Sequence, residues 1–122
     1  MELAIRLPWP PSVNGYWRNV KGKTLISADG RLYRNTVIKL CLGINTRFEG
    51  KIQVFIAASP PDKRRRDLDN MLKAPLDAMQ HAGIYDDDSQ IDDLHIWRSN
   101  VVPYGELGIT ISEMRVGSYG EK

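Results

Sequence analysis

The chain of 122 residues has little of several features that would assign it to a class of protein. Cys41 is its only cysteine, so an internal disulfide is excluded, and no cluster of cysteines and histidines has the spacing of a zinc site. No apolar run approaches the roughly 20 residues that cross a bilayer, and the N-terminus lacks the apolar core and cleavage site of a secretion signal. We therefore expect a cytoplasmic protein without a membrane segment.

The composition is that of one globular domain, with 42% hydrophobic and 26% charged residues. The net charge of +2 conceals an uneven distribution along the chain. Residues 1–66 carry 13 Lys and Arg against 4 Asp and Glu, a net charge of +9, whereas residues 67–122 carry 4 against 11, a net charge of −7. This asymmetry suggests a polyanionic partner, although a folded surface that mixes both signs for solubility explains it more simply.

Hydrophobic periodicity predicts strands that alternate with helices. The expected elements are a strand at 2–7, a helix at 29–44, a strand at 51–59, a helix from Asp69 to just before Gly83, and strands at 91–102 and 107–114. The proline-rich segment 8–17 predicts an irregular arm, and Pro75 favours a later start for the second helix. We expect a single α+β domain over residues 1–116 with a mixed β-sheet and two main helices, followed by a disordered tail at 117–122.

Helical spacing also predicts which side chains face the core. In the first helix these are Tyr33, Val37, Leu40, Cys41 and Ile44, and in the second they are Leu72, Leu76 and Met79. His81 lies near a helix end and His95 within a strand pattern, so structural roles are expected for both histidines. Trp97 is expected in the core.

The segment "KRRRDLDN" at 63–70 places four consecutive cations against Asp67 and Asp69. Ion pairs at exposed positions contribute only about 0–1 kcal/mol, so stability explains this arrangement poorly. The two aspartates come where a buried strand has ended, and the loop "YDDDSQ" at 85–90 returns with three more carboxylates. Such oxygen ligands suit Mg²⁺ beside a phosphate, and Lys73 lies one helical turn after Asp69.

Each of these residues also has a plainer interpretation. Asp69 can serve only as the N-cap of a helix, and residues 86–88 can form a solvated turn. A calcium-binding loop starting at Asp86 is excluded, because Ile91 stands where that loop requires glycine.

Three segments, "LPWPPSVN", "RRRDLDNMLKAPLDAM" and "GIYDDDSQIDDL", closely resemble the RusA family of Holliday junction resolvases in their order and separation. The resemblance runs from about Leu7 to Met114. It implies a magnesium-dependent endonuclease, with manganese as a substitute ion, that cuts paired strands of a four-way DNA junction in recombination and repair. It also implies a homodimer.

Carried over residue by residue, the resemblance gives the following roles. The metal-binding and catalytic residues fall on Asp67, Asp69, Lys73 and Asp88, with Asp87 as a further possible ligand. Asp86 departs from the pattern and leaves the third ligand open among residues 86–88. The expected DNA-binding residues are Arg64, Arg65, Arg66, Lys21 and Lys23, with Arg18 as a weaker candidate.

Two other functions stay open at this point. A DNA-binding module without catalysis would explain the charge distribution but not the separated acids. A restriction-type nuclease is suggested by Pro61 and Asp62, yet Asp69 stands where the lysine of that motif is expected. Trp9 and Trp17 either pack in the core or stack on unpaired bases.

Overall fold

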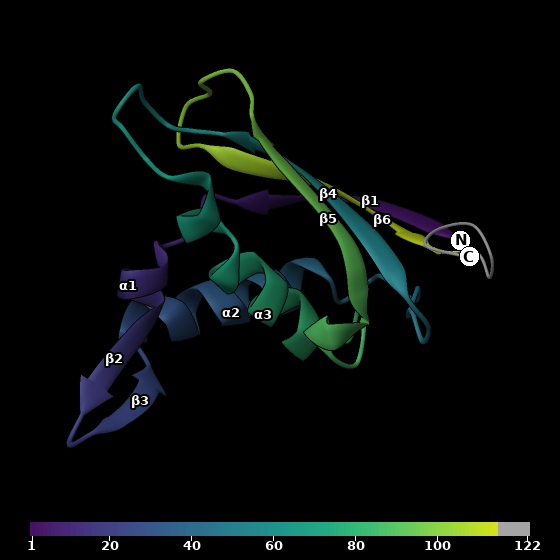
Figure 1. The fold of residues 1–122 in the computed structure, drawn as a ribbon, viewed down its shortest axis with the longest axis horizontal. Coiled ribbons are helices and arrows are strands. Elements are labelled where there is room, and N and C mark those ends of the chain that lie inside the picture. The colour runs from purple at the N-terminus through teal and green to yellow at the C-terminus, as the bar shows by residue number, and fades with distance from the viewer. Residues whose placement is uncertain (115–122) are drawn as a thin grey trace.

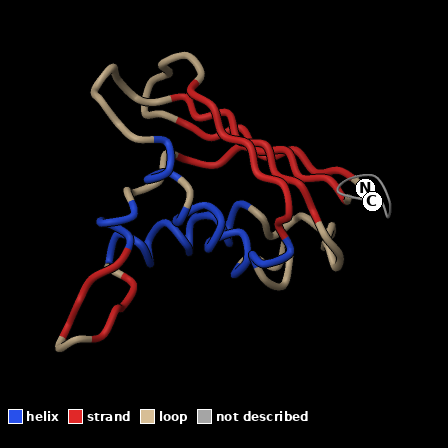
Figure 2. Tube along the Cα trace, viewed as in Figure 1, coloured by secondary structure: helices blue, strands red, loops and turns tan. Residues whose placement is uncertain are grey.

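A four-stranded sheet forms one layer of the structure, a computed structural model that describes residues 1–114. The strands are β1 (Glu2–Pro8), β4 (Ile52–Ser59), β5 (Ile91–Arg98) and β6 (Glu106–Glu113), in the spatial order β1-β6-β4-β5. β4 runs parallel to β5 and antiparallel to β6, so the sheet is mixed. Figure 2 shows the strands in red and the helices in blue. The parallel pair requires a crossover connection, which the second main helix supplies.

The second layer consists of two helices, α2 (Ala28–Leu40) and α3 (Lys73–His81), which cover one face of the sheet (Figure 1). Alternate residues of the inner strands face them. The core contains Ile52, Val54, Ile56, Leu107, Ile109 and Ile111 from the strands and Val37, Ala78 and Met79 from the helices. The predicted α+β class, with a mixed sheet and two main helices, is therefore confirmed.

The second helix starts later than Asp69, as Pro75 indicated. The chain first makes a 3-10 turn, η1 (Leu68–Met71), and α3 begins at Lys73. Pro75 then lies in the first turn of α3. A backbone N–H in that turn has no hydrogen-bond partner within the helix, so proline breaks no helical hydrogen bond there. Gly83 ends the helix with a φ of 83°, and its N–H donates to the carbonyl of Gln80 at 3.0 Å.

Two expected core positions are wrong. Leu40 is 55% exposed, because α2 ends there and the buried stripe passes to Cys41 instead. Trp97 is 46% exposed, because the strand register places it beside Ala57, whose side of the sheet is turned away from the helices. The strand expected at 91–102 ends earlier, at Arg98.

The segment expected to be an irregular arm contains regular structure. A short helix, α1 (Val13–Tyr16), leads into a hairpin of β2 (Trp17–Val20) and β3 (Lys23–Ile26), which extends away from the rest of the domain (Figure 1). Lys21 and Gly22 both have positive φ, at 51° and 80°, as a two-residue hairpin turn requires. A lysine in the first turn position is an uncommon signal, which is why the hairpin was not predicted.

Two expectations concern the ends and the surroundings of the domain. No helix within residues 1–114 has the length and apolar content to cross a membrane. The tail expected at 117–122 lies outside the described residues, and the boundary at residue 116 stays a prediction.

Candidate functional site

The two aspartates of the "RDLDN" segment lie at η1, directly before α3. Asp67 occupies the cap position of η1 but accepts no capping hydrogen bond, and Asp69 lies in the first turn. Asp69 is therefore not a helix cap, and that plainer interpretation is wrong. Asp67, Asp69 and Lys73, the first residue of α3, are all exposed to solvent. Their carboxylates and ammonium group are available to a ligand.

The basic loop before η1 is organised by Asp62. Its Oδ2 lies 3.1 Å from Arg64 Nη2, its Oδ1 lies 2.9 Å from Arg66 Nη1, and Oδ1 also accepts from the Arg64 N–H. Hydrogen bonds from Arg66 and then Arg64 hold the pKa of the Asp62 carboxyl well below its ordinary value. Arg65 is exposed and makes no ion pair within residues 1–114, so the three arginines differ in role.

Two tryptophans from the N-terminal segment hold cations of the acid motif. The Arg66 guanidinium lies 5.6 Å from the ring centre of Trp9, and the Lys73 ammonium lies 5.5 Å from that of Trp17. Both distances are within the range of cation–π attraction. Both tryptophans are also partly buried against the core, so each packs there with part of its side chain, and stacking on bases stays a prediction.

Two recesses flank the contact between Trp9 and Arg66. The first, the acid groove, has a volume of about 430 Å³ and is lined by Trp9, Pro10, Ser12, Arg65, Arg66, Asp67, Asn70 and Met71. The second, the arginine recess, has a volume of about 210 Å³. Its lining comprises Trp9, Ala58, Pro60, Asp62, Lys63, Arg64, Arg66, Asp67, Leu68, Met71, Arg98, Ser99 and Val101. Asp67 therefore borders both, and Arg98 is a site residue that the sequence analysis missed.

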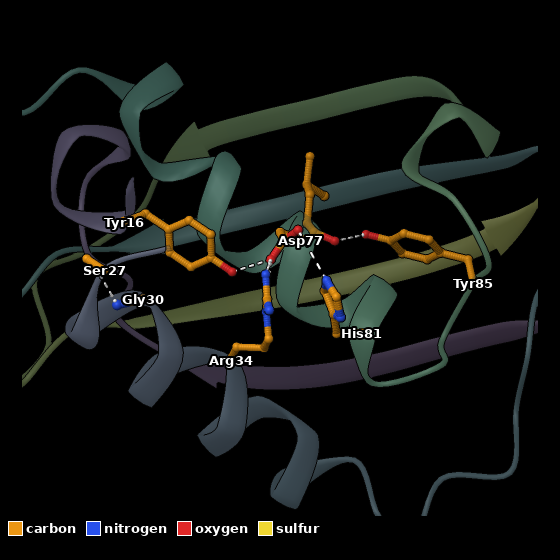
Figure 3. A network of polar contacts seen from close by, with 8 residues as sticks. Tyr16, Ser27, Gly30, Arg34, Asp77, His81 and Tyr85 are labelled. Atoms are coloured by element: carbon orange, nitrogen blue, oxygen red, sulfur yellow. Dashed lines mark hydrogen bonds and ion pairs between the residues drawn. The ribbon is translucent and has the colours of Figure 1, made fainter. Parts of the chain in front are cut away.

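A polar network around Asp77 joins the helices behind the site (Figure 3). Arg34 of α2 donates to Asp77 Oδ2 from Nη2 at 2.8 Å and from Nε at 3.3 Å, and the Tyr16 hydroxyl donates to the same oxygen. The imidazole Nε2 of His81 lies 3.7 Å from the other oxygen. Burial raises the pKa of Tyr16, and the hydrogen bond to Asp77 raises it further. The network therefore couples α1, α2 and α3.

Hydrogen bonds also fix the start of the hairpin, next to Tyr16 of this network. The Ser27 N–H donates to the Tyr16 carbonyl at 2.9 Å, and the Ser27 hydroxyl accepts from the Gly30 N–H at 2.9 Å (Figure 3). A Cβ atom at Gly30 would lie 2.5 Å from the Tyr16 carbonyl oxygen, so only glycine permits this approach. Trp17 is thereby fixed beside Lys73.

The acids of the second motif lie at the other end of α3. Asp87 caps the short turn η2 (Asp88–Gln90) by accepting from the Ser89 N–H at 2.9 Å, and this bond lowers the pKa of Asp87. Asp86 forms an ion pair with Arg47. The Asp88 N–H donates to the side chain of Gln80 at 3.0 Å, next to the last residue of α3.

One chain therefore does not assemble all the expected ligands. Gln80 follows Lys73 by seven residues, so Asp88 is displaced from the start of α3 by about 10 Å along the helix axis. Within residues 1–114, no three side chains of Asp, Glu, His or Cys lie close enough together to hold a metal ion. Asp67 and Asp69 lie at η1 and Lys73 begins α3, whereas Asp87 and Asp88 lie at the other end of that helix. The two aspartates at η1 nevertheless offer the oxygen donors that Mg²⁺ prefers.

The remaining basic candidates lie on the hairpin. Lys21 occupies its turn, Arg18 and Lys23 lie on β2 and β3, and all three are exposed. Because the four steps from Trp17 to Lys21 span about 13 Å, the turn lies well away from Lys73. Lys21 and Lys23 are therefore distant from Lys73, whereas Arg18 directly follows Trp17.

Comparisons with known proteins identify the family. The family model for endodeoxyribonuclease RusA matches residues 8–112. The crossover junction endodeoxyribonuclease of Enterobacteria phage HK97 is 43% identical over 115 residues, which cover 93% of this chain and 96% of the relative. The corresponding proteins of Enterobacteria phage 82 and Escherichia coli K12 are 42% and 40% identical, over 90% and 91% of this chain and 93% and 94% of theirs. The resemblance seen in the sequence is thus confirmed, and the chain belongs to the RusA family of endodeoxyribonucleases.

Proposed function

We propose that the protein is a magnesium-dependent endonuclease that resolves four-way DNA junctions in recombination and repair. The observation that carries this proposal is the exposed set of Asp67, Asp69 and Lys73 at η1 and the start of α3, with Lys73 over Trp17 and with Arg65 and Arg66 beside Asp67. The relatives named crossover junction endodeoxyribonuclease support the choice of substrate.

Asp67 and Asp69 are the residues that would hold the ion. Mg²⁺ is commonly bound through one or two carboxylates, with its other positions left to water and phosphate oxygens, and Mn²⁺ suits the same donors. When bound, the ion supplies Lewis acidity toward the scissile phosphate.

The chain's own cations handle the charge of the DNA. Two adjacent carboxylates repel a phosphate, and the exposed Arg65 beside them offsets this repulsion. The Lys73 ammonium, oriented by Trp17, donates to a non-bridging oxygen of the scissile phosphate as negative charge develops there. Arg64 and Arg66 contribute less free charge because they already pair with Asp62. Lys21 and Lys23, at the hairpin turn, contact an outer part of the junction, and Arg18 contacts it nearer to Lys73.

A homodimer suits both the substrate and the separation of the acids. A junction presents two equivalent strands, and a twofold pair of subunits presents two identical sites to them. Because Asp88 lies apart from Asp69 in one chain, we assign Asp88 to the site of the second copy, with Asp87 beside it. Asp86 is a weaker candidate for this ligand because its carboxylate already pairs with Arg47.

Mixing two inactive variants tests this assignment. Asp69→Asn and Asp88→Asn should each abolish cleavage of a four-way junction, whereas a refolded mixture should recover part of it. Recovery is expected because a mixed dimer combines the intact Asp69 of one chain with the intact Asp88 of the other. Failure to recover activity, with mixed dimers demonstrated by differently tagged chains, would place Asp88 in its own subunit's site or outside any site.

The alternative that the sequence left open is a protein that binds branched DNA without cutting it. Magnesium separates the two candidates. The nuclease should bind a four-way junction in chelator and cut it when magnesium is added, whereas the second candidate should bind it equally and leave both strands intact.

A further inference from the structure

The arginine recess has no part in the proposed metal site, although Asp67 borders it. Its floor is apolar and is formed by the end of β4, by η1 and by the loop after β5, through Ala58, Leu68, Met71 and Val101. Trp9 and Arg66 line this recess and the acid groove alike, so the two spaces are adjacent.

The size and walls of the recess suit a flat ring. Its volume of about 210 Å³ exceeds the roughly 150 Å³ of an apolar protein cavity that binds benzene. A single nucleobase therefore fits, with the indole of Trp9 as an aromatic wall. Bases of every sequence stack favourably on such a side chain.

The mouth of the recess is positively charged. Arg98 Nη2 donates to the Arg66 carbonyl at 2.6 Å, which fixes the Arg98 guanidinium while leaving its other N–H groups free to bind an acceptor. The side chain of Arg64 is 81% exposed at the same mouth. An apolar floor beside guanidinium groups suits a nucleobase, which carries hydrogen-bond acceptors on an aromatic ring.

We propose that the arginine recess receives one nucleobase, unstacked from the junction, whose phosphate lies in the acid groove. The inference rests on the proposed function and adds a binding site to it. A nucleotide can span both spaces because they adjoin, with Trp9, Arg66, Asp67 and Met71 in the lining of each. Unstacking costs least where a base has already lost a neighbour, as at the crossover of a junction.

Filling the recess while removing bases from the DNA tests this site. Val101→Trp adds an aromatic ring at a residue that is 44% exposed, so the fold should tolerate it. Binding is measured in chelator, for wild type and variant, to an intact four-way junction and to junctions that each lack one base near the cleaved phosphate. The variant should bind the intact junction about tenfold more weakly, and should equal wild type on the junction that lacks the bound base.

Two further variants serve as controls for this experiment. Ser99→Trp fills the same recess from another residue and should reproduce the result. Leu42→Trp, at a residue that is 77% exposed outside the recess, should behave as wild type on every junction. If neither filling variant folds, the test uses the wild-type protein alone. Its binding to the junction must weaken about tenfold when the base that occupies the recess is removed, because the contact of that base with Trp9 is lost.

A failure of the base site and a failure of the proposed function give different results. Equal weakening on every junction, or none on any, overturns the base site even if the wild-type protein binds and cuts the junction. If wild type neither prefers a junction to a linear duplex nor cuts it with magnesium, the proposed function fails instead.

Discussion

At the scale of single residues, neighbouring side chains of one type have different roles. Arg64 and Arg66 pair with Asp62, and Arg66 also lies over Trp9 with a side chain that is only 19% exposed. Arg65 stands between them, exposed and bordering the acid groove. Arg65 is therefore the loop cation most available to DNA, whereas Arg66 shapes the loop.

Arg65→Ala should weaken junction binding and flatten its salt dependence without lowering the melting temperature. Each lost phosphate contact lowers the slope of log K against log salt by roughly 0.9. Arg66→Ala, the matched control, should lower the melting temperature instead, because it breaks contacts with Asp62 and Trp9. An unchanged slope for Arg65→Ala, measured by titration at several salt concentrations, would move the DNA-binding surface elsewhere.

Asp62 makes the loop sensitive to acid. Its folded pKa lies below the unfolded value of about 3.9, so the stability it contributes is present above that pH. This stability is lost as the pH falls toward the folded pKa. Denaturant unfolding between pH 7 and pH 3 should therefore show a steeper loss of stability below about pH 4 for wild type than for Asp62→Asn. Parallel curves would show that the ion pairs of Asp62 contribute nothing in solution.

At the scale of elements, α3 organises the site because its ends hold different parts of it. Its first residue, Lys73, faces the hairpin, its middle residue Asp77 binds α1 and α2, and its end contacts Asp88 through Gln80. The pairing of Arg34 with Asp77 is largely shielded, with side chains 22% and 14% exposed. The Asp77 network is therefore expected to contribute more stability than a surface ion pair.

Asp77→Asn should lower the free energy of unfolding by about 2–3 kcal/mol, because the charged hydrogen bonds of Arg34 are lost and its guanidinium stays shielded. His81→Ala provides the control. His81 is 3.7 Å from Asp77 and its side chain is 43% exposed, so its removal should cost less than about 1 kcal/mol. Urea unfolding of both variants measures the difference, and equal losses would refute a central role for Asp77.

The elements also show how far the sequence alone could predict this fold. The apolar runs of β4 and β6, the late helix start at Pro75 and the stop at Gly83 are local signals, and the structure confirms the elements that they predict. The sequence does not predict the hairpin, because lysine is an uncommon residue at the turn position that Lys21 occupies. Trp97 was misplaced because its exposure depends on which face of the sheet the helices cover, and that is set by long-range packing.

At the scale of the whole molecule, the uneven charge of the sequence is partly neutralised by folding. Cations of the first half pair with acids of the second half, in the pairs Arg34 with Asp77, Arg47 with Asp86, and Lys51 with Asp92. The simpler explanation, a surface that mixes both signs, is therefore supported for these residues. Arg65, Lys21 and Lys23 form no ion pair within residues 1–114, and their binding of a polyanion stays a prediction.

The sequence predicts the candidate site only in part, because some of its contacts join segments that are far apart along the chain. Asp67, Asp69 and Lys73 are close in sequence, so their motif was enough to place them together. The contacts of Trp9 with Arg66 and of Trp17 with Lys73 join segments about 56 residues apart, and no local pattern announces them. Asp88 lies at the other end of α3 from Lys73, and no local pattern predicts that separation.

The Asp69→Asn variant tests the central claim, that the carboxylates at η1 carry metal-dependent cleavage. Asparagine keeps the size of the side chain but removes the charge that Mg²⁺ requires. Asp92→Asn is the control, since it removes an exposed carboxylate that pairs with Lys51. Junction binding in chelator, cleavage in magnesium and circular dichroism are measured for both. We predict that Asp69→Asn folds, binds the junction at least as tightly as wild type and does not cut it, whereas Asp92→Asn cuts normally. A folded Asp69→Asn protein that cuts at nearly the wild-type rate would contradict the assignment of this site.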